Sequence, residues 1–131
     1  MHFKKTGFIF FIIVQLVLIS ANVVTAQDET VETAESLMTF QLEALKNKDY
    51  EKFIEHGNKA FKEFTDEYSF DSLMMQSGAK IEKGYKLEYL GDILSIGMRK
   101  HLWKVHITGE KYQLLGSLTL SHGKVVGFDL E

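Results

Sequence analysis

Apolar positions recur at two different periods along this chain. Between residues 30 and 47 they are spaced three and four apart, which gathers them into one stripe of a helix. From Tyr85 onward apolar and polar residues alternate instead, as in strands that bury one face. The pattern therefore predicts helices in the first half of the chain and a sheet in the second.

Shorter helices are expected to follow the first one. The segments at about 49–56 and 58–67 carry apolar residues at helical spacing, with Gly57 between them as a left-handed stop. Ser69 or Asp71 would then cap a further helical turn that ends at Gly78.

Four strands are expected, and one face of each is much more apolar than the other. They cover about 85–93, 100–107, 112–120 and 126–130. An antiparallel sheet covered on one side has this pattern, and only the helices can cover it. The prediction is an α+β domain in which N-terminal helices pack on a curved, mainly antiparallel sheet of four or more strands.

The register of the second and third strands follows from a two-residue loop at Gly109–Glu110. That loop places Val105 opposite Leu114 and Trp103 opposite Gly116, so all of these residues share the apolar face. Gly116 would then leave room for the indole.

The next hairpin does not fit a two-residue loop. Such a loop at His122–Gly123 would turn Phe128 to the wrong face, because side chains alternate along a strand. We expect a bulged turn of odd length, with Gly123 at positive φ and Leu118 opposite Phe128 or Val126.

The first 26 residues have the pattern of a secretory signal peptide. Lys4 and Lys5 precede an uncharged apolar run, and the small residues Val24 and Ala26 end it. Cleavage after Ala26 predicts a secreted or periplasmic protein. An uncleaved anchor over 7–26 is the alternative, because that segment is about long enough to cross a bilayer.

Composition limits what the exported part can be. Residues 27–131 are enough for a single domain, and without cysteine it has no disulfide support. The exported part carries 13 Lys and Arg against 18 Asp and Glu, a net charge of −5. This charge disfavours nucleic acid and anionic lipid as partners, so a membrane contact is expected only through an uncleaved N-terminal segment.

The chain resembles the nuclear transport factor 2-like superfamily, whose cone-shaped fold is also called cystatin-like. The segments that carry the resemblance are 40–53, 102–107 and 123–128, with the sequences FQLEALKNKDYEKF, LWKVHI and GKVVGF. They are similar to the uncharacterised domain found alone or ahead of secreted α/β-hydrolases. The resemblance implies helices packed into a curved sheet, often with a pocket and often as a homodimer. It does not settle function, because the superfamily includes enzymes and non-enzymatic modules.

Motifs for common chemistries are absent. His101 and His106 are five apart on one strand and so face opposite ways, and His56 and His122 lie at a helix end and a turn. We expect each of these histidines to be exposed, and no metal or cofactor site. Neither a nucleophile motif nor a phosphate-binding loop occurs.

An acid/base pocket is the remaining catalytic possibility. Three tyrosines could donate a proton, and three other side chains could accept one. The donors are Tyr50, Tyr89 and Tyr112, and the acceptors are Asp92, His101 and Asp129. Alternation puts both aspartates on the polar face of the sheet and leaves His101 as the base candidate on the apolar face.

The leading hypothesis is an exported, non-catalytic module that binds a small apolar ligand or a partner protein, with a homodimer through the sheet left open. The alternative is a small-molecule isomerase, cyclase or hydrolase, and an immunity or inhibitor-like role is a third hypothesis. The residues expected to line a pocket are Tyr50, Tyr89, His101, Trp103 and Phe128.

Overall fold

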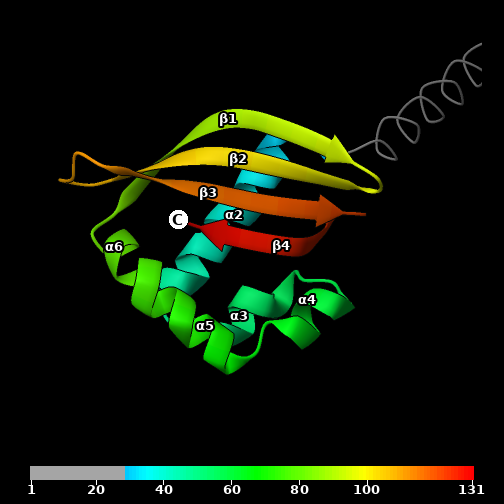
Figure 1. Cartoon of the computed structure of the whole chain (residues 1–131), viewed down its shortest axis with the longest axis horizontal. Helices are drawn as coiled ribbons and strands as arrows, with labels where there is room; N and C mark the ends of the chain where they lie inside the picture. The colour runs from blue at the N-terminus through cyan, green and yellow to red at the C-terminus, as the bar shows by residue number, and fades with distance from the viewer. Residues whose placement is uncertain (1–28) are drawn as a thin grey trace, which may run out of the picture. The chain divides into compact units, whose positions relative to one another are not determined.

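The computed structural model describes residues 29–131, and the predicted signal peptide and its cleavage site lie outside them. Helices come first and an antiparallel four-stranded sheet follows, so the domain belongs to the α+β class as expected (Figure 1). The elements are α2 (Val31–Lys46), α3 (Tyr50–Glu55), α4 (Lys59–Phe64), α5 (Glu67–Leu73), a π-helical turn η1 (Met74–Gly78), α6 (Ala79–Ile81), β1 (Tyr85–Ser95), β2 (Met98–Ile107), β3 (Gln113–Ser121) and β4 (Lys124–Leu130).

Helix α2 matches the predicted helix and lies across the sheet. Its apolar stripe of Ala34, Met38, Leu42 and Leu45 is fully or almost fully buried. A Cβ on Gly116 of β3 would lie 2.5 Å from the Met38 Cε. The missing side chain at Gly116 therefore makes room for Met38 of α2, and not for the Trp103 indole as the sequence suggested.

Helices α3 and α4 begin at side-chain caps. The Asp49 carboxylate accepts from the Lys52 N–H, and the Asn58 side chain accepts from the Phe61 N–H. The prediction that Gly57 adopts a left-handed conformation is wrong, because its φ is not positive. Gly57 instead forms a parallel bridge with Val125 of β4. That bridge sets the first helices against the edge of the sheet.

The last helical segment is longer than expected. Asp66 caps α5, because its carboxylate accepts from the Ser69 N–H. The predicted cap was Ser69 or Asp71. Gly78 does not end the segment, because it is helical at φ −60° and the turn η1 leads into α6. The buried Ser77 hydroxyl donates to the Leu130 carbonyl at 2.9 Å, and this tertiary contact holds η1 against β4.

The strands form a simple meander in the order β1-β2-β3-β4. The predicted register of β2 and β3 is confirmed, with Val105 opposite Leu114 and Trp103 opposite Gly116. Ladder pairing stops at His106–Gln113, so the connection is more open than a two-residue loop.

The β3–β4 turn differs from the prediction. Ser121 pairs with Lys124, which makes His122–Gly123 a tight two-residue turn, with φ of 50° and 75°. The extra residue sits inside β4, because Leu120 pairs with Val125 and Thr119 pairs with Gly127. This bulge at Val126 restores the expected pairing of Leu118 with Phe128.

A second bulge lies in β1 and reverses the alternation beyond it. Leu90 opposes no residue, and Gly91 has φ 140°. Asp92 then pairs with His101, and Ile93 pairs with Lys100. The prediction that Asp92 lies on the polar face is therefore wrong, and Ile93 is exposed because it turns away from the core.

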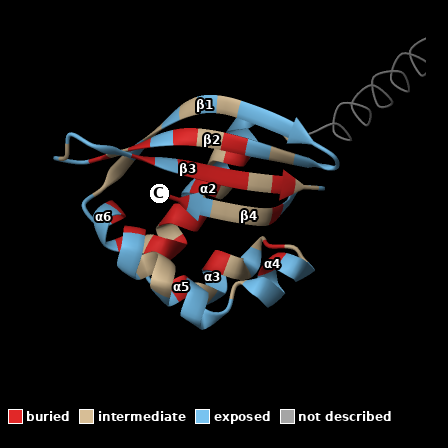
Figure 2. Ribbon diagram, viewed as in Figure 1, coloured by how far each residue is buried: buried red, intermediate tan, exposed pale blue. Residues whose placement is uncertain are grey.

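The face of the sheet under the helices holds the core (Figure 2). Trp103, Leu114 and Leu118 are buried there, and the half-buried Phe128 packs against them. The prediction that the apolar side chains of the strands gather on one face is confirmed.

Candidate functional site

The structure separates the five expected pocket residues into two groups. Tyr89, His101 and Trp103 form a ring cluster on β1 and β2. Tyr50 and Phe128 belong instead to an aromatic cluster between the helices and β4. The described residues therefore offer two different candidate sites.

The first group is a buried polar–aromatic cluster. The Tyr89 hydroxyl lies 3.0 Å from His101 Nδ1, within hydrogen-bond distance. The His101 ring centroid is 5.9 Å from that of Trp103, which is fully buried. The expectation that His101 is exposed is wrong, because only 2% of its surface is accessible.

The β1 bulge brings Asp92 to this face, where Arg99 of β2 also lies. Asp92 lies opposite His101 in the ladder, and its carboxylate accepts a hydrogen bond from Arg99. By contrast, the other acid/base candidates lie elsewhere. Asp129 and Tyr112 are exposed, and Tyr50 donates to the Thr65 carbonyl at 2.7 Å.

Phe128 of the second group lies in the floor of an open groove between α3, α4, α5 and β4, whereas Tyr50 lies outside it. Phe53 is central, with its ring centroid 6.0 Å from Phe61, 5.1 Å from Phe70 and 5.2 Å from Phe128. The groove has a volume of about 410 Å³, and we call it the aromatic groove. Its other lining residues are Thr65, Tyr68, Ser69, Ser72, Leu73 and Gln76.

One backbone position of β4 opens toward this groove. Leu115 and Glu131 exchange both of their backbone hydrogen bonds, at 2.6 and 3.0 Å. Hydrogen-bonded and non-hydrogen-bonded pairs alternate along an antiparallel ladder. The backbone N–H and C=O of Asp129 and Gly127 therefore also point toward β3, whereas those of Phe128 point away from it. Backbone groups of Leu130 and Val125, on the same edge of β4, have partners. The Leu130 carbonyl accepts from the Ser77 hydroxyl, the Val125 N–H donates to the His56 carbonyl, and the Val125 carbonyl accepts from the Asn58 N–H. The N–H and C=O of Phe128 therefore lie at an uncovered edge.

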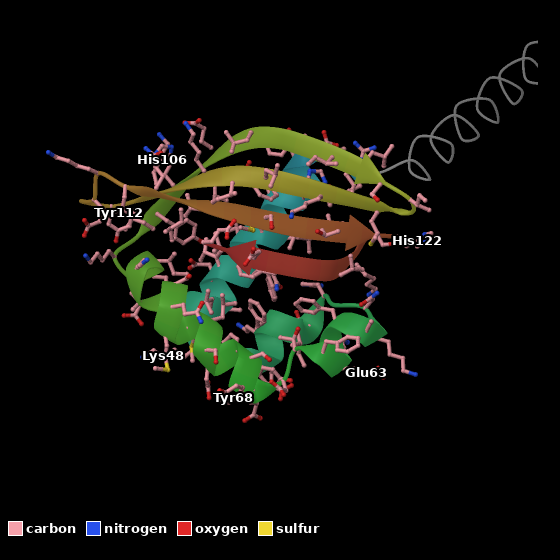
Figure 3. All side chains as sticks on the ribbon, in the orientation of Figure 1. Lys48, Glu63, Tyr68, His106, Tyr112 and His122 are labelled. Atoms are coloured by element: carbon pink, nitrogen blue, oxygen red, sulfur yellow. The ribbon has the colours of Figure 1, made fainter. Side chains whose placement is uncertain are left out.

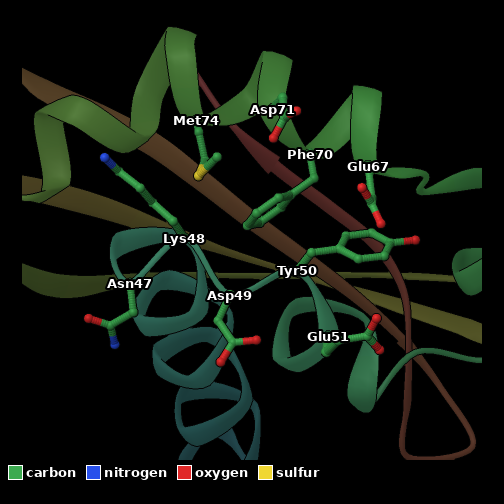
Figure 4. A pocket seen from close by; sticks show the side chains of 9 residues that line it. All are labelled: Asn47, Lys48, Asp49, Tyr50, Glu51, Glu67, Phe70, Asp71 and Met74. Carbon is green, nitrogen blue, oxygen red and sulfur yellow. The ribbon is translucent and has the colours of Figure 1, made fainter.

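Phe70 also lines a second, acidic hollow, which Figure 4 shows from close by. Its volume is about 460 Å³. One lysine, Lys48, stands among four carboxylates there, which are Asp49, Glu51, Glu67 and Asp71. Partial burial raises the pKa of Tyr50, and the negative charges of Glu51, Glu67 and Asp66 raise it further. This part of the surface therefore favours cations.

The described residues hold no group of three or more His, Asp or Glu side chains that could bind a metal ion. His106 points to the outer face and lies 3.2 Å from Glu88, so it is separated from His101 as the spacing indicated. Within 29–131 no helix is long and apolar enough to cross a membrane.

No protein-family model matches the chain, and no curated protein matches it either. The site must therefore be interpreted from its own geometry.

Sequence reasoning missed two parts of the sites. The sequence pattern gives no sign that Phe70 lines two hollows, because that depends on how α5 packs against α3 and β4. Asp92 was assigned to the wrong face, although a glycine inside an alternating strand, here Gly91, is a known sign of a bulge.

Proposed function

We propose that this chain is an exported, non-catalytic binding module whose aromatic groove takes a short segment of a partner protein. The segment would place an apolar side chain over Phe53 and Phe128 and a basic side chain toward the acidic hollow. The family resemblance to cone-shaped modules is part of this proposal, and so are export and the lack of catalysis.

The observation that carries the proposal is that Phe70 lines both hollows. A groove with an apolar floor lies directly beside a hollow with four carboxylates and one lysine. Charge complementarity then favours a cationic partner. The uncovered N–H and C=O of Phe128 can bond one peptide unit of that partner, as in strand addition at a sheet edge.

Two short peptides test this. In NMR titrations, acetyl-Lys-Phe-Leu-Lys-amide should shift the backbone signals of Phe128 and Leu73 in a saturable way. Acetyl-Glu-Phe-Leu-Glu-amide should bind at least about tenfold more weakly, because the hollow repels it. Equal binding of both peptides would contradict the acidic contribution, and no shift at Phe128 with either would contradict the site.

The helices offer matched control variants. Tyr68 and Phe64 are 80% and 83% exposed aromatics, but only Tyr68 lines the groove. Tyr68→Ala should weaken the cationic peptide severalfold and Phe64→Ala should not. Likewise Glu67→Gln, in the hollow, should weaken binding more than Glu63→Gln, whose carboxylate lies 3.9 Å from the Lys59 ammonium. Figure 3 shows Tyr68 and Glu63 on the helical side of the domain.

An acid/base enzyme is the second candidate, and the Tyr89–His101 pair is the observation that favours it. A substrate would have to reach an imidazole that is only 2% exposed. Diethyl pyrocarbonate acylates histidines that solvent reaches, and it should modify the exposed His122 well before His101. Rapid modification of His101 would favour the enzyme over the binding module.

A further inference from the structure

The β1–β2 hairpin ends in an exposed aliphatic tip, which we define as residues 93–100. Ile93 is 57% exposed, Leu94 71%, Ile96 98% and Met98 42%. Single exposed apolar residues are ordinary, but a contiguous group marks an interaction surface. None of the residues 93–100 lines the aromatic groove or the acidic hollow.

The charges of the tip are ordered along the hairpin. Lys100 pairs across the ladder with Ile93, and Arg99 pairs with Leu94. Ile96 and Gly97 lie beyond them at the turn. Arg99 and Lys100 are the basic residues of the tip, which contains no acidic residue. The adjacent carboxylate, that of Asp92, forms an ion pair with Arg99. Ile96 and Met98 therefore lie nearer the turn than either cation, whereas Ile93 and Leu94 lie level with Lys100 and Arg99.

We propose that this tip docks on an anionic lipid surface. Ile96 leads into the boundary of the acyl chains. Leu94 follows at the level of Arg99, where Arg99 and Lys100 meet the phosphates. The order of apolar tip and basic collar matches the order of layers in a membrane surface. A protein interface would instead centre on Trp or Tyr in a packed pocket, and the tip contains neither.

The negative net charge of the domain gives this docking an orientation. General adsorption to anionic lipid is disfavoured at a net charge of −5, taken over 27–131. The tip, where Lys100 adds a positive charge to the Arg99–Asp92 pair, is then the part that approaches the membrane.

A cysteine-directed fluorophore distinguishes the tip from other surfaces, because the chain contains no cysteine. Ser95→Cys carries a nitrobenzoxadiazole label at the tip, and Lys111→Cys carries the same label in the β2–β3 connection. These two positions are at opposite ends of the sheet, as Figure 3 shows for the neighbouring turns at His122 and Tyr112. The label reports contact by each end even when the N-terminal residues bind lipid themselves.

With full-length protein and phosphatidylcholine vesicles containing phosphatidylglycerol, emission at position 95 should shift to the blue and rise several-fold. The label at position 111 should not change. Leu94→Ser with Ile96→Ser should reduce the partition coefficient by at least about tenfold without changing the circular dichroism spectrum, since both side chains are largely exposed. Lys100→Gln should weaken binding to anionic vesicles only.

Three results would overturn the proposal. They are an unchanged label at position 95, equal changes at 95 and 111, and a blue shift at 95 that grows with protein concentration without vesicles. The last would assign the tip to a contact between two copies of the chain.

Discussion

Met38 of α2 fills the space above Gly116 of β3 that a side chain would occupy. This contact fits the long helix to the sheet. A Cβ on Gly116 would lie 2.5 Å from the Met38 Cε and 3.1 Å from the Val105 Cγ2. The methionine end can move aside, but the valine on the adjacent strand has little freedom.

Gly116→Ala should therefore lower the free energy of unfolding by about 1–3 kcal/mol, the usual range for overpacking a core. Met38→Ala alone should cost about 2–5 kcal/mol through the cavity it leaves. The double variant should cost less than the two changes added, because the truncated methionine gives the new methyl group room. Urea unfolding of the four proteins measures this coupling, and strict additivity would contradict the contact.

Gln41 is a buried polar side chain in the core. It is fully buried on α2, and neither its amide nitrogen nor its amide oxygen has a hydrogen-bond partner among the described residues. Gln41→Met keeps similar length and helix propensity and removes both polar atoms. We expect the variant to gain about 1–2 kcal/mol of stability and to melt at a higher temperature. A lower melting temperature would show that the amide is bonded in solution.

Hydrogen exchange tests the uncovered edge of β4. The amide of Phe128 faces the aromatic groove, whereas those of Gly127 and Asp129 face β3. The Phe128 amide should exchange at least about tenfold faster than its two neighbours. Similar protection at all three positions would mean that the groove covers the edge. Exchange that slows when the cationic peptide is added would support strand addition.

Tyr85 is expected to make the stability of the protein depend on pH in the alkaline range. Burial, followed by the hydrogen bond to Glu43 and its negative charge, raises the pKa of Tyr85 above 10.0. The unfolded chain therefore loses this proton at a lower pH than the folded protein does. Stability from Tyr85 is complete below pH 10.0 and is lost as the pH rises toward the folded pKa.

Tyr85→Phe should therefore make the unfolding free energy fall less steeply above about pH 10 than it does in the unchanged protein. At neutral pH the variant should lose about 1 kcal/mol, because the Tyr85 hydroxyl donates to Glu43 at 2.8 Å. Urea titrations at neutral and alkaline pH give both values. Parallel pH profiles for the two proteins would contradict the assignment.

Local patterns alone determined much of this fold. The three- and four-residue spacing fixed the buried stripe of α2, since a helix repeats every 3.6 residues whatever its surroundings. The alternation in β2 and β3 set their buried faces, and matching these faces across the hairpin set their register, although the connection is more open than two residues. His101 and Trp103 were placed on one face for the same reason, and the structure brings them together with Tyr89.

Tertiary contacts decided the rest, including most of the candidate sites. Each bulge adds one residue to one strand only, so every later side chain of that strand changes to the other face of the sheet. The bulge at Leu90 thereby places Asp92 opposite His101. The bulge at Val126 keeps Phe128 opposite Leu118. The aromatic groove joins Phe53, Phe70 and Phe128 from two helices and a strand. A one-dimensional pattern shows which face of an element is apolar, but only packing shows which apolar faces meet and which are left uncovered, because that depends on how the elements fill the space between them.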